Sequence, residues 1–442
     1  MPNASKALRA AFLRLIIFVG VASLKNFFKS LGPGILFAST AIGVSHLVQS
    51  TRAGAEYGFA LLWAVLLANV LKYPFFEFGS RYANATGRSL IDGYRSMGSW
   101  MLWLYFLVTL ASMFFVAAAV GAVTGGFMHN LFQLEAMISY QLTVALLFAI
   151  CLAILLLGQY RALDKLIKVI GSVLLISTLL ATALALTKGP KAEPFVFFNP
   201  EVLNPQSAGF AFLIALMGWM PTAVDLSTWN SLWTLARIKE SGYRPSLRET
   251  LREFNLGYWV SALLAPCFLL LGAYLLFGVN RSMPNDSAGF ANAIVGLYVE
   301  NMGEWSRLLI TAAAFSIMFG TCIAVFDGYG RSLERTLLLL REPQPGRSAP
   351  AFWYRGSVAM VAFGALLIIF FFGPALKSLV DLATTISFLI APVIALANYR
   401  LVRGKLMPKT ARPGKVMRLL SVLGIVFLTL FSLAYLVYLL VY

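Results

Sequence analysis

Apolar residues gather along the chain in blocks of about twenty or more, and basic residues, glycine or proline separate the blocks. Because a helix of about 20 residues crosses the hydrocarbon core of a bilayer, each block predicts a transmembrane helix. The segment before the first block, residues 1–30, has an apolar centre between basic ends, which is typical of an interfacial helix on the cytoplasmic side. The eleven predicted spans are residues 33–51, 58–81, 99–127, 136–158, 164–187, 208–235, 252–278, 303–328, 355–373, 375–399 and 416–441.

The composition leads to the same class of protein. Apolar residues make up 60% of the 442 positions and charged residues only 12%, against roughly 45–50% and about 25% in a soluble domain. We therefore predict an all-α integral membrane protein that has the lipid bilayer as its partner and almost no chain left for a soluble domain. The three cysteines, Cys151, Cys267 and Cys322, form no pair motif and are predicted to be small buried apolar residues.

Lysine and arginine are distributed unevenly between alternate connections. The connections that follow the second, fourth, sixth, eighth and tenth spans are basic, whereas the opposite ones near residues 128–137, 188–207 and 280–303 are not. The positive-inside rule then predicts a cytoplasmic N-terminus and an outer C-terminus in the cell inner (plasma) membrane. The same dispersal explains the net charge of +17, so no nucleic acid is expected as a partner.

Two of the predicted spans are interrupted by polar residues, glycine or proline. The first contains "STAIGVSHLVQS" and the sixth contains "LMGWMPTAVDLSTWN", in which Pro221 removes a backbone donor and frees carbonyl groups. Unpaired backbone groups in the middle of a membrane need protein or a water-filled cavity as partners. The residues that these interruptions offer to a bound molecule are Thr40, Gly43, Ser45, His46, Gln49, Met217, Trp219, Met220, Thr222, Asp225 and Asn230.

Interruptions in the first and sixth spans stand at corresponding positions of two five-helix halves, which indicates two inverted repeats with a binding site between the breaks. The predicted divisions are a first repeat at 31–187, an outer loop at 188–207, a second repeat at 208–399, a cytoplasmic loop at 400–415 and an eleventh helix at 416–442. The alternatives stay open at this point. Each break could be a simple kink, and His46 could be a packed, hydrogen-bonded histidine.

The stretch "LGPGILFASTAIGVSHLVQSTRAGAEYGFALLWAVLLANVLKYPFFEFGSRYANATGRSLIDGYR" resembles the first two helices of the Nramp (natural resistance-associated macrophage protein) family of divalent metal transporters. It has the GPG start, the AGA-x-[FY]-G turn, the LLW second helix and the TGR-x-L loop of that family. "MP" at Met220 and Pro221 extends the match. The resemblance implies a LeuT-like fold, a substrate held between the broken helices, alternating access and symport with a second ion.

This chain departs from the family at the residues that carry the chemistry. The Asp-Pro-Gly-Asn motif of the family falls on residues 43–46, so the metal-binding aspartate is replaced by Gly43 and the asparagine by His46. The Met-Pro-His motif falls on residues 220–222 and loses its histidine. The polar ligand position of helix ten falls on Thr384 or Thr385, and the third helix has no acidic residue where the family has proton-relay carboxylates. The chain is thus predicted to be a divergent member with a remodelled site.

The remaining candidate metal ligands are His46 and Met220, together with freed carbonyls of Thr40 and Met217. This neutral set suits a transition metal better than a hard ion, because imidazole and thioether are softer ligands than oxygen. Asp225 is a candidate replacement for the missing carboxylate, since an acid inside a membrane is functional by default.

Charged residues in the later helices have structural alternatives. Asp225 could instead pair with Arg237 or Arg331. Asp327 and Arg331 stand four residues apart near the cytoplasmic end of the eighth helix, which predicts a gate or a structural ion pair.

Three functions fit these observations. The first is import of a divalent metal cation such as Mn²⁺ or Mg²⁺, the second is transport of a small organic solute on the same scaffold, and the third is a non-transporting scaffold or sensor protein. The chain has no phosphate-binding loop, nucleophile elbow or HExxH motif, so neither an enzyme nor a bound cofactor is expected. The sequence leaves the oligomeric state open.

Overall fold

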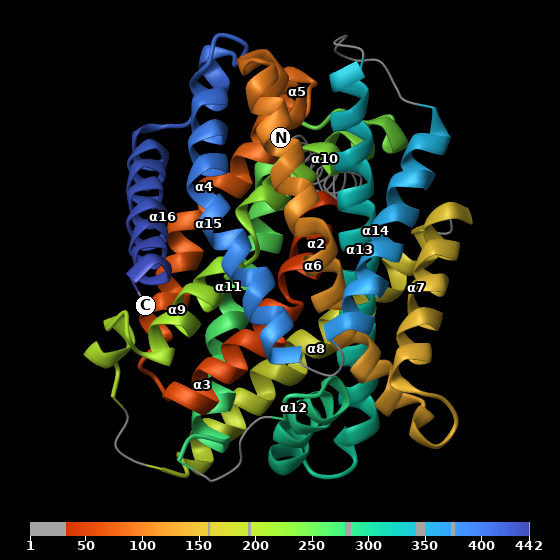
Figure 1. The fold of residues 1–442 in the computed structure, drawn as a ribbon, viewed down its shortest axis with the longest axis vertical. Helices are drawn as coiled ribbons and strands as arrows, with labels where there is room; N and C mark the ends of the chain where they lie inside the picture. Colours follow the sequence, from red (N-terminus) through yellow and green to blue (C-terminus); the bar gives the residue numbers. More distant parts are fainter. Residues whose placement is uncertain are drawn as a thin grey trace, which may run out of the picture.

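The computed structural model describes residues 32–157, 160–192, 196–278, 284–341, 350–372 and 376–441. The predicted interfacial helix at 1–30 lies outside these residues. Helices make up nearly all of the described chain and run mostly along one common direction (Figure 1). Each predicted span coincides with helical structure.

The helices that correspond to the predicted spans have the following bounds: α2 Pro33–Ala41, a π-helix Ser45–Ser50 and α3 Thr51–Tyr57 for the first; α4 Leu62–Thr86; α6 Ser99–Leu131; α7 Tyr140–Leu157; α8 Tyr160–Lys188; α9 Ala208–Trp219 and α10 Ser227–Ser241 for the sixth; α11 Leu247–Leu275; α13 Ser306–Arg341; α14 Ala351–Phe372; α15 Leu376–Arg403; and α16 Lys415–Val441. Two further helices, α5 Leu90–Met97 and α12 Ser287–Met302, lie at opposite ends of the molecule (Figure 1). Short 3₁₀ turns occur at Leu134–Ala136, Pro200–Leu203, Val224–Leu226 and Lys409–Ala411.

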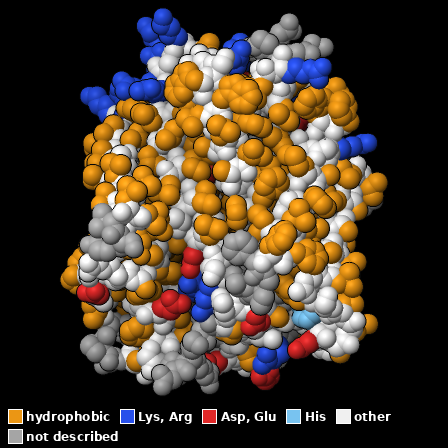
Figure 2. Space-filling view, viewed as in Figure 1, with side chains coloured by type: hydrophobic (Ala, Val, Ile, Leu, Met, Phe, Trp, Pro, Cys, Tyr) orange, Lys and Arg blue, Asp and Glu red, His pale blue; other side chains and the backbone are white. Residues whose placement is uncertain are grey.

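The surface is that of a protein embedded in a bilayer. Within the described ranges, eight helical segments are long and apolar enough to cross a membrane, and the broken sixth helix counts as one of them. Apolar side chains cover the middle of the molecule, while Lys and Arg gather at the end where α5 lies (Figure 2). Large apolar side chains such as Leu107, Leu157 and Phe371 are more than half exposed, which is expected of residues that face lipid.

Two hydrophobic cores divide the interior. One is built mainly from α6, α7, α8, α12, α13 and α14, and the other mainly from α2, α3, α4, α9, α11, α15 and α16. Residues around the break between α9 and α10 alternate between them, since Trp219 and Ala223 belong to the first core and Met220 and Val224 to the second. The break in the sixth helix therefore lies at the boundary between the two cores.

Close backbone contact holds α9 against α15. A Cβ atom built on Gly218 would lie 2.1 Å from the carbonyl oxygen of Thr384, so no residue with a side chain fits there without a shift of backbone. The glycine that interrupts the apolar run of the sixth helix thus has a packing role next to the break.

Candidate transport site between the two helix breaks

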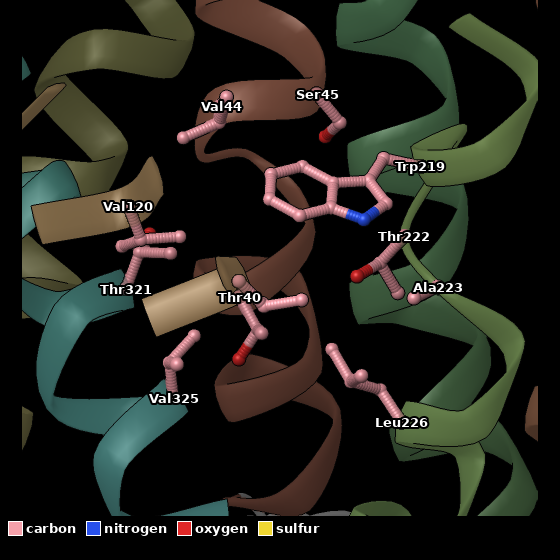
Figure 3. Close-up of a pocket in the computed structure, with 11 residues that line it drawn as sticks. Thr40, Val44, Ser45, Val120, Trp219, Thr222, Ala223, Leu226, Thr321 and Val325 are labelled. Atoms are coloured by element: carbon pink, nitrogen blue, oxygen red, sulfur yellow. The ribbon is translucent and has the colours of Figure 1, made fainter. Parts of the chain in front are cut away.

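A small cavity lies between the two breaks, with α6 and α13 closing the other side (Figure 3). The cavity volume is about 10 Å³, which is room for about one water molecule. The indole of Trp219 extends across the middle of the lining, and its Nε1 donates to Ser387 Oγ at 3.0 Å. The lining residues are Thr40, Val44, Ser45, Val116, Val120, Trp219, Thr222, Ala223, Leu226, Thr321 and Val325.

Hydroxyl groups satisfy the backbone carbonyls that the first break exposes. Ser45 Oγ donates to the carbonyl oxygen of Ala41 at 2.5 Å, and Thr321 Oγ1 donates to that of Ser39 at 2.6 Å. Thr40 Oγ1 donates to the carbonyl of Leu36, one turn earlier within α2, at 2.7 Å. A hydroxyl that donates its proton keeps lone pairs on its oxygen. These three hydroxyls, which all belong to lining residues, can therefore still offer oxygen to a cation in the cavity.

His46 lies outside this lining and is fully buried. Its Nδ1 is 2.7 Å from Ser45 Oγ, and its Nε2 is 2.9 Å from the carbonyl oxygen of Ser261 on α11. The carbonyl of Ser261 can only accept, so Nε2 carries the proton of the neutral ring. Nδ1 faces the Ser45 hydroxyl, for whose single proton Nδ1 and the carbonyl of Ala41 compete. Both ring nitrogens thus have protein partners in this arrangement. This geometry is that of the packed, hydrogen-bonded histidine considered from the sequence, and neither His46 nor Asp225 is among the residues that line the cavity.

A buried lysine binds the carbonyls that the second break exposes. Lys72 Nζ, from α4, donates to the carbonyl oxygens of Met217 at 3.0 Å, Gly218 at 3.0 Å and Thr222 at 2.8 Å. The carbonyl of Met217 was expected to face a bound metal, and this expectation needs correction because an ammonium group already holds it. Thr222 is the residue of the three whose side chain lines the cavity.

Met220 and Asp225 do not reach the cavity. Met220 is fully buried in the core formed around α4, α9 and α15, and its neighbours Trp219 and Thr222 line the cavity instead. Asp225 is 3% exposed, and its charged neighbour is Lys72 rather than the predicted Arg237 or Arg331. Its Oδ1 has no hydrogen-bond partner among the described groups.

The remaining candidates from the sixth and tenth helices serve packing contacts. Asn230 donates from its side-chain amide to the carbonyl of Phe76 on α4 at 3.3 Å. The hydroxyl of Thr384 donates back to its own helix, to the carbonyl of Val380 at 2.9 Å. Thr385 also lies outside the cavity lining.

Gly43 stands against the cavity wall without lining it. A Cβ atom added to this glycine would lie 2.7 Å from Cγ2 of Thr321 and 3.1 Å from its Oγ1. The position that corresponds to the family's aspartate is therefore directed at α13, and Thr321 fills the space into which a longer side chain would extend.

Gln49 belongs to a polar cluster nearer the end of the molecule that carries α12. Arg52 donates to both carboxylate oxygens of Asp381 on α15, at 2.8 and 3.3 Å, and Gln49 Nε2 donates to Asp381 Oδ1 at 3.0 Å. The Arg52 guanidinium also stacks 4.8 Å from the ring centre of Phe212 on α9. This cluster, which we name the Arg52–Asp381 latch, joins the first, sixth and tenth helices in their halves nearer α12.

The predicted ion pair of the eighth helix is present. Arg331 Nε lies 2.8 Å from Asp327 Oδ2, and Asp327 also accepts from Trp233 Nε1 at 2.9 Å and from the Tyr354 hydroxyl at 2.7 Å. The pair joins α10, α13 and α14 near the end where α5 lies. A gating role for it stays a prediction.

Lining residues from α6 and α13 were missed in the sequence. Val116, Val120 and Val325 carry no polar signal, so spacing in a single apolar helix could not separate them from lipid-facing valines. Thr321 is a polar residue inside the eighth span, and this polarity is a signal in the sequence that could have identified it as a lining residue. Within the part of the chain that the structure describes, no three His, Cys, Asp or Glu side chains come together around a possible metal position.

Comparison with known proteins places this geometry in a family. A model of the family "Natural resistance-associated macrophage protein-like" matches residues 34–438. An uncharacterized protein of Pasteurella multocida, PM0681, is 35% identical over 92% of both chains. The metal transporter Nramp3 of Oryza sativa is 26% identical over 66% of this chain and 53% of its own.

Solved structures give the fold. A manganese transporter of Eremococcus coleocola superposes with a TM-score of 0.69 at 14% identity, over 92% of this chain and 86% of that one. The protein is thus a multi-pass membrane protein with a LeuT-like fold, two inverted five-helix repeats and an eleventh helix. The chain belongs to the Nramp family, whose members and structural neighbours are transporters and not enzymes.

Because Met220 is buried in a core and does not line the cavity, its replacement should affect stability and not the choice of metal ion. Replacing Met220 with alanine is expected to lower the free energy of unfolding by about 2–5 kcal/mol, as for other buried Met-to-Ala changes. Since the thioether lies outside the cavity lining, we expect equal effects on Mn²⁺ and Mg²⁺ transport per folded molecule. Chemical denaturation together with uptake of both ions checks this, and a loss confined to the softer Mn²⁺ would return Met220 to the ligand set.

Proposed function

We propose that the chain is a secondary transporter that moves a divalent metal cation by alternating access, with the cavity between the two helix breaks as its binding site. The cation is of the size of Mn²⁺ or Mg²⁺. The protein is proposed to lie in the plasma membrane with its N-terminus inside and its C-terminus outside. Residues 31–187 and 208–399 are proposed as its two repeats, and the last helix as an addition to them.

The size of the cavity is the observation that carries this proposal. Space for about one water molecule suits a small ion and not a metabolite. The hydroxyls of Thr40, Ser45, Thr222 and Thr321 offer oxygen, which Mg²⁺ and Mn²⁺ prefer. Family membership and the names of a metal transporter from rice and a manganese transporter structure support the same cargo.

Uptake into proteoliposomes tests the proposal. Purified protein with an entrapped metal-sensitive dye is expected to show saturable uptake of Mn²⁺ or Mg²⁺, and Thr222→Val is expected to reduce it at least about tenfold by removing a cavity oxygen, a loss of about 1.4 kcal/mol. The matched control is Thr234→Val, because Thr234 is also a buried threonine of the sixth helix but bonds only back to Asn230. Equal uptake by the two variants would contradict the proposed site.

A small organic solute is the second candidate cargo. The observation that favours it is the lining itself, which holds the Trp219 indole and five valine or leucine side chains but no carboxylate among its described residues. Such a cargo requires the cavity to widen when it opens. Absence of metal uptake, combined with ligand-induced stabilisation in a metabolite screen, would replace the metal by an organic cargo.

A further inference from the structure

The ammonium group of Lys72 sits in a cage of backbone oxygens at the end of α9. Its side chain is fully buried, and its three hydrogen bonds go to the carbonyls of Met217, Gly218 and Thr222 at 2.8–3.0 Å. An ammonium group has three protons. All of them are used here, so Lys72 has no donor left for a molecule in the neighbouring cavity.

The cage exists because the sixth helix breaks at this point. The last carbonyls of a helix have no partner within it, and they form the negative end of the helix dipole. α9 ends at Trp219, and Pro221 supplies no N–H to continue the ladder. The break therefore gathers several carbonyl oxygens that need a positively charged or proton-donating partner.

Asp225 lies near this cage as a compensating charge, without a direct hydrogen bond to Lys72. It is 3% exposed, its Oδ1 has no hydrogen-bond partner among the described groups, and its charge interacts with that of Lys72. Buried charges need a compensating charge, and removing one partner of such a pair is costly. One ammonium and one carboxylate neutralise each other, whereas a divalent ion in the same place would leave one excess positive charge.

We propose that the carbonyls of Met217, Gly218 and Thr222 form a binding site for a small monovalent cation, which Lys72 fills as a tethered occupant and whose charge the nearby Asp225 carboxylate balances. Oxygen atoms alone make up the site, which is the ligand chemistry of hard cations. The site is distinct from the proposed cargo cavity, because neither Lys72 nor Asp225 lines that cavity. With Lys72 in place, these carbonyls are withheld from the cargo.

Removing the Lys72 ammonium group should leave the carbonyl site open to small cations from solution. Lys72→Met is expected to lower the unfolding temperature of the purified protein in choline chloride by at least about 5 °C. Sodium, potassium or ammonium chloride at the same ionic strength is expected to restore half of this loss or more in the variant, and to leave the wild type unchanged. Lys239→Met, at an exposed lysine of α10, is the matched control and should respond to none of the salts.

Two further variants separate the site from a general effect on folding. Lys72→Met/Asp225→Asn should lose the restoration by small cations, because the carboxylate is gone. Lys72→Gln keeps two N–H donors but not the positive charge. If the unfolding temperature of this variant equals that of the wild type, the site needs no cation and the proposal is wrong. If Lys72→Met is recovered as folded protein only when it is purified in one of the small cations, the proposal holds. If it folds in no salt, or folds in all of them without a cation-dependent shift, the proposal is wrong.

Discussion

Restoring an aspartate at position 43 is expected to raise the affinity for Mn²⁺ at least about tenfold, or about 1.4 kcal/mol, once Thr321 is shortened to alanine. The backbone directs a Cβ at this position towards Thr321, which lines the cavity. The threonine methyl group would stand 2.7 Å from that Cβ, so Gly43→Asp alone is too crowded. In Gly43→Asp/Thr321→Ala the carboxylate gains room beside the hydroxyls that line the cavity. Attraction between a carboxylate and a cation a few ångströms away is worth several kcal/mol inside a protein, even at an effective dielectric constant of about 20.

Titration calorimetry with Mn²⁺ measures this gain. Thr321→Ala alone controls for the loss of the threonine, which donates to the carbonyl of Ser39. Gly43→Asn/Thr321→Ala has the same shape without the charge and should gain little. An equal rise in affinity with asparagine would show that shape and not charge limits metal binding, and no rise with aspartate would mean that position 43 does not reach the cargo.

Neutralising Asp381 is expected to open the end of the molecule that carries α12. In the Arg52–Asp381 latch, two hydrogen bonds between charged groups join the first and tenth helices, and the Arg52 guanidinium contacts Phe212 of the sixth. Bidentate pairs of this kind are among the stronger polar contacts. The Asp381 side chain is 35% exposed, so solvent screens part of the attraction. We expect Asp381→Asn to shift the balance towards a form open at this end by about 1.4 kcal/mol, which is tenfold.

Labelling of a single cysteine reports this shift. In a background in which Cys151, Cys267 and Cys322 are replaced by alanine, Ser45→Cys places a thiol in the cavity lining. In the proposed topology the α12 end faces outward, so a membrane-impermeant thiol reagent added outside intact cells should label it about ten times faster with Asp381→Asn. Glu300→Gln removes one partner of the exposed Lys191 and Glu300 ion pair at the same end and serves as the matched control. Equal labelling rates in the two variants would mean that the latch does not control access.

The positions of the helices could be predicted from the sequence because they follow from local apolar blocks and their punctuation. The breaks were predictable for the same reason, since Gly43 and Pro221 interrupt apolar runs in the first and sixth spans. What a broken backbone does to its side chains could not be predicted, because regular helical spacing no longer fixes their direction there. Trp219 faces the cavity and Met220 faces away, although both are adjacent to the same break.

The partners of the polar residues depend on contacts between segments far apart in the chain. His46 bonds to Ser261, which follows it by 215 positions. Lys72 bonds to carbonyls that follow it by 145 to 150 positions and lie on both sides of Pro221. His46 and Lys72 both fall within predicted spans, the first and the second, and polar or charged groups inside a membrane need partners. The sequence offered no means to tell that the lysine would hold the carbonyls that had been assigned to the metal.

These contacts explain how the two helix breaks can be stable in a chain that lacks the family's aspartate at position 43. The first break has its exposed carbonyls satisfied by hydroxyls, and the second has them satisfied by an ammonium group. Neither break therefore depends on a bound cation to pair its backbone groups. A cargo cation would be held by neutral oxygens alone, which predicts weak binding compared with a site that contains a carboxylate.

The most direct test of the proposed transport site is the position of Mn²⁺ in crystals grown with the ion, located by its anomalous scattering. Our account predicts one peak in the cavity, in direct or one-water contact with the hydroxyl oxygens of Thr40, Ser45, Thr222 or Thr321. A peak beside the sulfur of Met220 or the ring of His46, or none at Mn²⁺ concentrations that saturate uptake, would contradict it.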